Sequence, residues 1–460
     1  MSLPTVVPTS PSAPRSRGAV VGLALLLVLL CSACERPFAE ALPPDVRVVA
    51  PDLSTVLTAD SARVQVEASS SRTVSRVLIN GREMTFNADL GVWERTISLP
   101  PGATPLILTS EDRDGTAGRD TAFAVRLPHR TLSGPRLPDP RAGHTATRLL
   151  DGDVLVTGGV SSINTAARTN MYMLPRGGGA FQPHGNLLAG RVGHTASLLP
   201  DGRVLILGGS RRYNPATTGD LVESVEIYDP ITGSIAPVRF SGEPIRRMHH
   251  TAVVRQENGD VLIDLYGGRG DIRYGADPRL GIRGDLRTFR LSGDSLEALN
   301  RLDTASFLVP ALGHVQASTR TLDPGELGRY VVAGTTYGTQ SVDTVSFMLD
   351  YTAPQGINFD DSVPSMRLSR AFAAAATLGQ RAGFILVFGG TQGSSGSALG
   401  RPEVYADDAR RFVRFPESTT LFRRFDHSAT FTGSNRILLV GGFSPSGNAL
   451  SVGEFFETSL

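Results

Sequence analysis

Cysteine and lysine are nearly or wholly missing from this chain of 460 residues. The only cysteines are Cys31 and Cys34, and all 45 basic residues are arginines. Beyond residue 34 the chain therefore has no disulfide, no thiolate nucleophile and no cysteine-ligated metal. The lack of lysine excludes a Schiff-base lysine and the phosphate-binding lysine of a P-loop.

An excess of charge of one sign is also missing. The 45 basic and 44 acidic residues leave a formal net charge of +1. Nucleic-acid-binding proteins usually present a strongly basic face, so the composition predicts no nucleic-acid partner. The 50 glycines and 30 prolines favour short strands joined by turns over long helices.

The N-terminal region has the layout of an export signal. Arg15 and Arg17 precede the apolar run Gly18–Leu30, which is too short to span a bilayer comfortably. The run ends in "LLCSAC", which resembles a bacterial lipoprotein signal, and the resemblance implies lipidation of Cys34. Ordinary signal-peptidase cleavage after Ala33 is the alternative.

We therefore expect a signal peptide over residues 1–33 and a short tether over residues 34–44. A lipid anchor would hold the protein on a membrane surface without spanning the membrane. Glu35 after the cysteine is compatible, by the same resemblance, with the outer membrane of a bacterial cell envelope. If the anchor is not used, the protein is expected to be secreted or periplasmic.

Residues 45–127 alternate between apolar and polar positions with a period near two, as in "ARVQVEA" and "VSRVLING". Glycine turns such as Asn80-Gly81 and Asp114-Gly115 separate these runs, which predicts a small antiparallel β-sandwich. The segment resembles bacterial immunoglobulin-like modules, which implies a spacer. Trp93, the only tryptophan, is expected in the core and not on a sugar-stacking surface.

The rest of the chain repeats one unit. The stretch "RAGHTATRLLDGDVLVTGG" (141–159) returns as "RVGHTASLLPDGRVLILGG" (191–209), and four further copies follow. Such a period indicates an array of one supersecondary unit. The equivalent positions of the six copies are His144, His194, His250, His314, Ala373 and His427.

Each copy reads as a strand, a turn, a second strand that ends in paired glycines, a third strand such as "VEIYDPITG" and a weaker fourth strand. These features resemble the kelch repeat. The resemblance implies an all-β protein, with a six-bladed kelch β-propeller over residues 128–460 after the sandwich. The usual kelch tryptophan is absent, and we expect Phe181, Leu296 and Phe412 in its place.

The last copy is incomplete, because too few residues follow His427 for a full unit. The segment 130–140, "RTLSGPRLPDP", has the character of a fourth strand. We expect this segment to complete the last blade, so that the ring has no open edge.

The loops after the glycine pairs and before each Arg-x-x-His share one rim, called here the loop-side rim, and the Asp-Gly turns lie on the opposite, turn-side rim. Long polar loops on a rigid scaffold are common binding sites. The candidate binding residues on the loop-side rim are Arg211, Arg212, Tyr213, Arg269, Asp271, Arg273, Tyr274, Tyr337, Gln340, Gln392 and Arg401.

Two sets of repeated residues have competing interpretations. The repeat histidines could bind a metal, but symmetry spreads them around an axis, so a structural hydrogen bond to backbone at the strand start is favoured. The arginines that open the copies could form an electropositive mouth, or brace neighbouring blades, which is favoured. These arginines are Arg141, Arg191, Arg247, Arg370 and Arg424.

The sequence favours a non-catalytic binding or scaffold protein of the cell envelope, with a protein and possibly a glycan as partner. We expect no metal and no cofactor. A copper radical oxidase is excluded, because that chemistry needs a cysteine in the propeller. The alternative is a carbohydrate-binding protein, or a periplasmic mutarotase of the sialic-acid type. The "RGD" at 269–271 is interpreted as a chance match.

Overall fold

A computed structural model describes residues 42–274, 277–302, 312–320, 322–334, 346–352, 357–379, 383–392, 397–419 and 421–460. The described elements are strands and one short 3-10 turn, η1 (Thr218–Asp220), which confirms the all-β class. The expected signal peptide and Cys34 lie outside these residues. No helix within the described ranges is long and apolar enough to cross a membrane.

Residues 45–126 form two four-stranded sheets with a shared apolar core. Trp93 is partly buried, and its ring lies 5.2 Å from that of Phe86. One sheet has the order β1 (Asp45–Ala50), β2 (Ser61–Ser69), β6 (Val92–Ser98), β5 (Thr85–Asn87), and the other β4 (Arg82–Glu83), β3 (Val74–Ile79), β7 (Gly102–Asp112), β8 (Ala117–Arg126).

Six antiparallel four-stranded units, named units 1 to 6, follow. Unit 1 is β10 (Thr145–Arg148), β11 (Val154–Thr157), β12 (Asn170–Leu174), β13 (Gln182–Asn186); unit 2 is β14 (Thr195–Leu198), β15 (Val204–Leu207), β16 (Val225–Asp229), β17 (Ser234–Ser241). Unit 3 is β19 (Thr251–Glu257), β20 (Asp260–Tyr266), β23 (Leu286–Ser292), β24 (Ser295–Leu302); unit 4 is β25 (Val315–Ser318), β26 (Arg329–Ala333), β27 (Ser346–Asp350), β28 (Asn358–Asp360). Unit 5 is β29 (Ala374–Leu378), β30 (Phe384–Phe388), β33 (Glu403–Ala406), β34 (Arg411–Arg414); unit 6 is β35 (Ser428–Gly433), β36 (Arg436–Val440), β37 (Gly453–Thr458), β9 (His129–Gly134).

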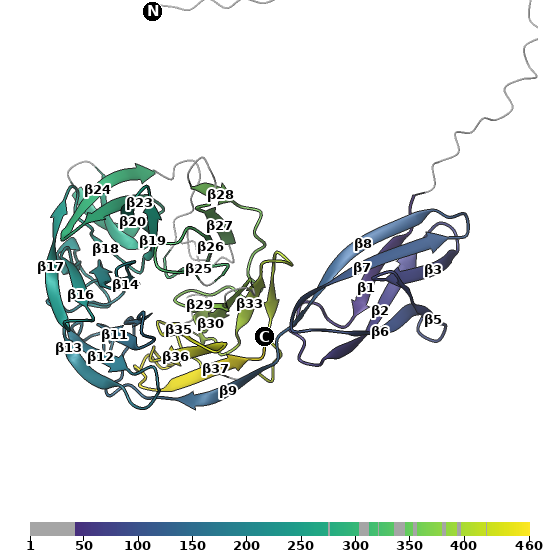
Figure 1. The fold of residues 1–460 in the computed structure, drawn as a ribbon, viewed down its shortest axis with the longest axis horizontal. Helices are drawn as coiled ribbons and strands as arrows, with labels where there is room; N and C mark the ends of the chain where they lie inside the picture. Colours follow the sequence, from purple (N-terminus) through teal and green to yellow (C-terminus); the bar gives the residue numbers. More distant parts are fainter. Residues whose placement is uncertain are drawn as a thin grey trace, which may run out of the picture.

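The units stand in a propeller-like ring (Figure 1). The first strand of each unit lies toward the centre, and β10 of unit 1 contacts both β14 of unit 2 and β35 of unit 6. The ring is not a set of separate sheets throughout, because β17 and β24 pair in parallel and join units 2 and 3. Short extra sheets are formed by β18 (Arg247–Met248), β21 (Arg269–Tyr274) and β22 (Asp277–Ile282), and by β31 (Thr391–Gln392) and β32 (Ser397–Ala398).

The strand that precedes unit 1 is the outer strand of unit 6. β9 pairs antiparallel with β37, from Gly134 opposite Gly453 to His129 opposite Thr458. The Nε of Arg130 donates to Glu457 at 2.6 Å, and the His129 ring stacks on Phe456. Chain segments from opposite ends of the ring region therefore share one sheet.

The glycine pairs exist because the next unit packs against them. At Gly158 a Cβ atom would lie 2.4 Å from the carbonyl oxygen of Arg191 and 2.6 Å from the His194 ring. Both Gly158 (φ +65°) and Gly159 (φ +91°) also have left-handed backbone, which favours glycine. The amide of Gly159 donates to the same Arg191 carbonyl at 2.9 Å, so the pair forms a joint between units.

The residues expected in place of the kelch tryptophan are buried. Phe181, Leu296 and Phe412 are at most 4% exposed, and each belongs to an apolar cluster of the ring. They fill the layers between neighbouring sheets.

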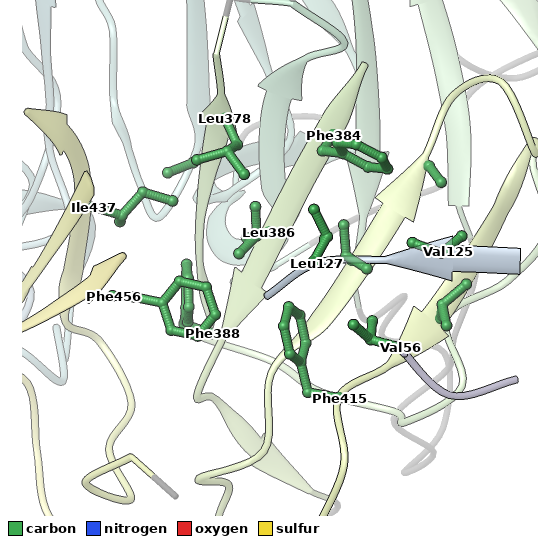
Figure 2. Close-up of a cluster of buried hydrophobic side chains, with 14 of the residues drawn as sticks. Val56, Val125, Leu127, Leu378, Phe384, Leu386, Phe388, Phe415, Ile437 and Phe456 are labelled. Atoms are coloured by element: carbon green, nitrogen blue, oxygen red, sulfur yellow. The ribbon is translucent and has the colours of Figure 1, made fainter. Parts of the chain in front are cut away.

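The sandwich docks on unit 5 of the ring. Val56, Val125 and Leu127 join Phe384 and Phe415 in one buried cluster (Figure 2). The amide of Val56 donates to the carbonyl of Arg414 at 2.7 Å, and a parallel bridge joins Thr55 to the same residue. Apolar burial and backbone hydrogen bonds thus fix the two parts to each other.

Candidate functional site

The arginines that open the repeats are internal braces. Each is at most 1% exposed, and each donates from Nη1 to the first glycine carbonyl of its own unit, as Arg191 does to Gly208 at 2.9 Å. Each also pairs with a carboxylate, which for four of the five belongs to the arginine's own unit and for Arg141 is Asp139, between β9 and β10. These braces thus lie within units and not between neighbouring units as predicted. The pairs are Arg141–Asp139, Arg191–Glu226, Arg247–Asp285, Arg370–Glu403 and Arg424–Glu454.

The repeat histidines connect neighbouring units through hydroxyl groups, not through backbone as predicted. The Nε2 of His194 lies 2.8 Å from the Thr157 hydroxyl. In four cases the hydroxyl belongs to the residue that follows the repeat histidine of the preceding unit. The corresponding contacts are His194–Thr145 at 3.3 Å, His250–Thr195 at 3.3 Å, His314–Thr251 at 3.0 Å and His144–Ser428 at 3.1 Å.

These imidazoles are buried and neutral. Burial lowers the pKa of His144 to about 3 and holds the pKa values of His194, His250 and His427 well below their usual range. Within the described part of the chain, no group of three or more histidine, cysteine, aspartate or glutamate side chains could hold a metal ion. The hydroxyl contacts of His144, His194, His250 and His314 join neighbouring units, which gives these histidines a structural role.

The position before each repeat histidine lies closest to the axis and has left-handed backbone in every unit. Amide-to-carbonyl hydrogen bonds link these positions around the axis, for example from Gly193 to Gly143 at 2.9 Å. Three units carry glycine here, but the other three carry His249, Phe372 and Asp426, with φ between 50° and 55°. Such conformations cost about 1–3 kcal/mol each and cluster at functional sites.

These three residues were missed by the sequence analysis. The sequence did carry a signal for them. The position before the repeat histidine is glycine in "RAGH", "RVGH" and "ALGH", but it is another residue in "RMHH", "RAFA" and "RFDH". A glycine-to-side-chain exchange at a left-handed position is a stronger functional signal than the repeated histidines beside it.

Tyr213 reaches across the axis to two of them. Its hydroxyl donates to the Asp426 carboxylate, whose other oxygen lies 3.7 Å from Nδ1 of His249. Its ring packs edge-on against His249 and Phe443. Because these partners come from units 3 and 6, the loop of unit 2 that carries Tyr213 closes the loop-side end of the axis.

Burial disfavours the charged form of each of these side chains. It raises the pKa of Asp426, although His249 and the Tyr213 hydroxyl lower it in part. Burial also raises the pKa of Tyr213 and lowers that of His249.

A small cavity of about 130 Å³ lies beneath this cluster. Ligand pockets usually measure about 300–1,000 Å³, so it is too small for a sugar. Its walls are formed by the repeat histidines and by the residues that precede them. They consist of Gly143, His144, Gly193, His194, His249, His250, Gly313, His314, Phe372, Ala373, Asp426 and His427.

Of the predicted rim residues, Arg211 and Arg212 are exposed beside the partly buried Tyr213. The Nε of Arg212 lies 3.7 Å from Asp220, and no described residue pairs with the Arg211 guanidinium. Their loop is held by backbone bonds, from Ala167 to the Arg211 carbonyl and from Arg211 to the Asp220 carbonyl, both 2.8 Å. The two arginines stand on an ordered loop.

Two other predicted rim residues, Arg401 and Gln392, lie in the segment of unit 5 between β30 and β33. Arg401 is tied down by the Phe415 carbonyl at 2.7 Å and by Glu417 at 3.3 Å, while Gln392 is exposed in β31. Arg269 begins β21, the strand that also contains Asp271, Arg273 and Tyr274. Tyr337 and Gln340 lie outside the described residues.

No protein-family model matches this chain, and no curated protein matches it. Solved structures do match. One is the structure of YjhT, which aligns with a TM-score of 0.51 and 15% identity, over 70% of this chain and 95% of that one. At this identity the likeness concerns the fold, and it supports a propeller-like all-β architecture.

Proposed function

We propose that this chain is an exported six-bladed kelch-type β-propeller, anchored by lipid at Cys34, that binds an acidic segment of an envelope protein without catalysis. The binding surface is the loop-side rim around Arg211 and Arg212. The sandwich serves as a rigid spacer between the anchor and the ring.

The observation that carries this proposal is the plug made by Tyr213. Among the described residues, the cavity beneath the plug measures only about 130 Å³, so we infer that binding at this end takes place on the surface, as it does with protein partners. Arg211 and the 64%-exposed Arg212 stand on an ordered loop beside it. An ordered loop loses little conformational entropy on binding.

The alternative of sugar binding or mutarotation at this rim has less support. Sugar sites usually need stacking aromatics and a pocket of ligand size, but the only tryptophan belongs to the sandwich and the axial cavity is small. The acidic and basic side chains nearest the axis, Asp426 and His249, lie against Tyr213 and not in an open pocket of ligand size.

The test compares the wild-type protein with the double variant R211E/R212E in pull-downs from envelope extract, followed by affinity measurement with the captured partner. We expect the double variant to bind the partner about tenfold or more weakly than the wild type, and added salt to weaken binding by the wild type. The matched control R176E/R239E makes the same charge change at exposed positions elsewhere on the ring.

Equal loss in the control, or no loss in either variant, would contradict the proposal. A glycan array run with the same proteins tests the alternative. If a sugar binds the wild-type protein but not R211E/R212E, the ligand of this rim is a carbohydrate and not a protein.

A further inference from the structure

A second, larger cavity of about 540 Å³ lies at the turn-side end of the ring. Its volume is within the usual range for ligand pockets. It lies at the far ends of the innermost strands, away from the plug at Tyr213. Every unit contributes to its wall, for example through Arg148, Ser197, Val254, Ser318, Thr377 and Phe431.

Arg148 is the exceptional residue of this wall. Its Nε is buried and has no hydrogen-bond partner, and no carboxylate of the described chain forms an ion pair with its guanidinium. Its near neighbour is the Phe431 ring, 5.9 Å from the guanidinium carbon. The five repeat arginines, by contrast, each face a carboxylate. A partly buried cation without a counter-charge is costly, and a bound anion would remove that cost.

Three hydroxyl groups of the wall are already engaged. The Thr377 hydroxyl donates to the Ser318 carbonyl at 2.7 Å, the Thr430 hydroxyl to the Ala146 carbonyl at 3.0 Å, and the Ser318 hydroxyl to the Arg320 carbonyl at 2.6 Å. Fewer donors therefore remain for a polyhydroxylated ligand. Most of the other side chains that line the cavity are apolar, among them Leu150, Leu198, Val254, Leu322 and Phe431.

Among the described residues of the wall, the only acidic side chain is Asp323, which is exposed on the unit 4 loop. This loop reaches toward neighbouring units, because Gly325 forms a parallel bridge with Arg255 of unit 3 and packs against Pro200 of unit 2. Arg148 is the only cationic side chain among the same wall residues, so an anionic group is favoured beside it.

We propose that this cavity binds a small amphipathic carboxylate. The carboxylate pairs with the Arg148 guanidinium, which can donate two parallel hydrogen bonds, and the apolar body packs against Phe431 and Leu322. This site is separate from the loop-side rim and does not depend on the function proposed there.

The test is calorimetric titration of the purified full-length protein with octanoate and 3-phenylpropanoate, with 1-octanol and octylamine as uncharged and cationic probes. We expect at least one carboxylate to bind, the alcohol to bind about tenfold or more weakly, and R148Q to weaken carboxylate binding by a similar factor. The control R176Q removes an exposed arginine of unit 1 outside the cavity and should bind like the wild type.

A second variant keeps the proposal testable if R148Q does not fold. L150E places a negative charge at a wall residue that is 62% exposed, so it should fold and still lose carboxylate affinity. The proposal is overturned if neither carboxylate binds, if 1-octanol binds as tightly as octanoate, or if R148Q and L150E both bind like the wild type.

Discussion

At the scale of single residues, the histidine ring depends on pairs of side chains in neighbouring units. In most units the imidazole forms a hydrogen bond with a hydroxyl group of the preceding unit, as His144 does with Ser428. Unit 5 has Ala373 in the histidine position, and Val315 of unit 4 stands where the hydroxyl would be. His427 breaks the rule, because Ala374 offers it no hydroxyl and its Nε2 has no partner.

Substitution of Ala374 by serine should repair this gap. The new hydroxyl occupies the position equivalent to Ser428 and can bond His427, which predicts a gain of about 0.5–1.5 kcal/mol in unfolding free energy. Urea denaturation of A374S measures the gain. The control is A429S, one residue beyond Ser428, and equal effects of both substitutions would contradict the pairing.

Removal of one charge from a buried brace should be costly. Glu226 is fully buried, pairs with Arg191 and accepts the amides of Leu188 and Ala189 at 2.8 and 3.1 Å. E226Q should therefore lose about 3–5 kcal/mol of stability. The control E417Q changes a carboxylate that is 89% exposed and should shift stability by less than about 1 kcal/mol. Similar losses in the two variants would refute the assignment of Glu226 as a brace.

The buried histidines predict acid sensitivity. The folded-state pKa of His144 is about 3, against an ordinary value of 6.5, and His194, His249, His250 and His427 shift in the same direction. Between these values the unfolded chain binds more protons, so stability is present above pH 6.5 and is lost as the pH falls toward 3.

The raised pKa values of the buried acids Asp426, Glu403 and Glu454 act in the opposite direction, because their protonated forms suit the folded state. Their effect sets in as the pH falls through those raised folded-state pKa values, and it offsets part of the histidine effect. The melting temperature is expected to fall between about pH 6.5 and pH 5. H427L should reduce this fall, and a melting temperature that is flat over the interval would contradict the account.

At the scale of elements, the sequence predicted the strands better than the loops. The pattern of turn, apolar run and glycine pair follows from local rules, and β10 and β11 lie on either side of the predicted Asp151-Gly152 turn. The path of the loop that carries Tyr213 depends on a contact with Asp426, which lies 213 residues away in the chain. No local pattern encodes such a contact.

The same loop offers an element-scale prediction. The Asp220 carboxylate accepts the Ala216 amide at 2.8 Å, and its backbone carbonyl accepts the Arg211 amide. D220A should loosen the loop and speed tryptic cleavage at Arg211 and Arg212 about threefold or more, with little change in global stability. Cleavage at the exposed Arg176 serves as the internal control. Equal rates in variant and wild type would mean that Asp220 does not order the loop.

At the scale of the whole molecule, the docking of the sandwich could not be predicted. Val56, Val125 and Leu127 fit the alternating pattern of the sandwich itself, and the pattern does not say which apolar residues face another domain. Likewise, the sequence placed binding residues on the loop-side rim, but the larger cavity lies at the turn-side end, where the wall is assembled from side chains of all six units.

Substitution of Val56 by aspartate should separate the two parts. A carboxylate placed among Phe384 and Phe415 is buried without a partner, which predicts a loss of about 3 kcal/mol or more at the junction. Small-angle scattering should then show a larger radius of gyration. V49D, at a position of the sandwich that is 40% exposed, is the control and should leave the shape unchanged. An unchanged radius for V56D would mean that this junction does not hold the domains together.

The ring itself depends on whether β9 and β37 stay paired in solution, because every assignment to a rim assumes a closed circle. Hydrogen–deuterium exchange of the full-length protein measures this pairing directly. If β9 stays paired, the alternate amides of Arg130–Ser133 that face β37 should exchange as slowly as the amides of β37 itself. Rapid exchange of those amides, while β36 remains protected, would contradict the account.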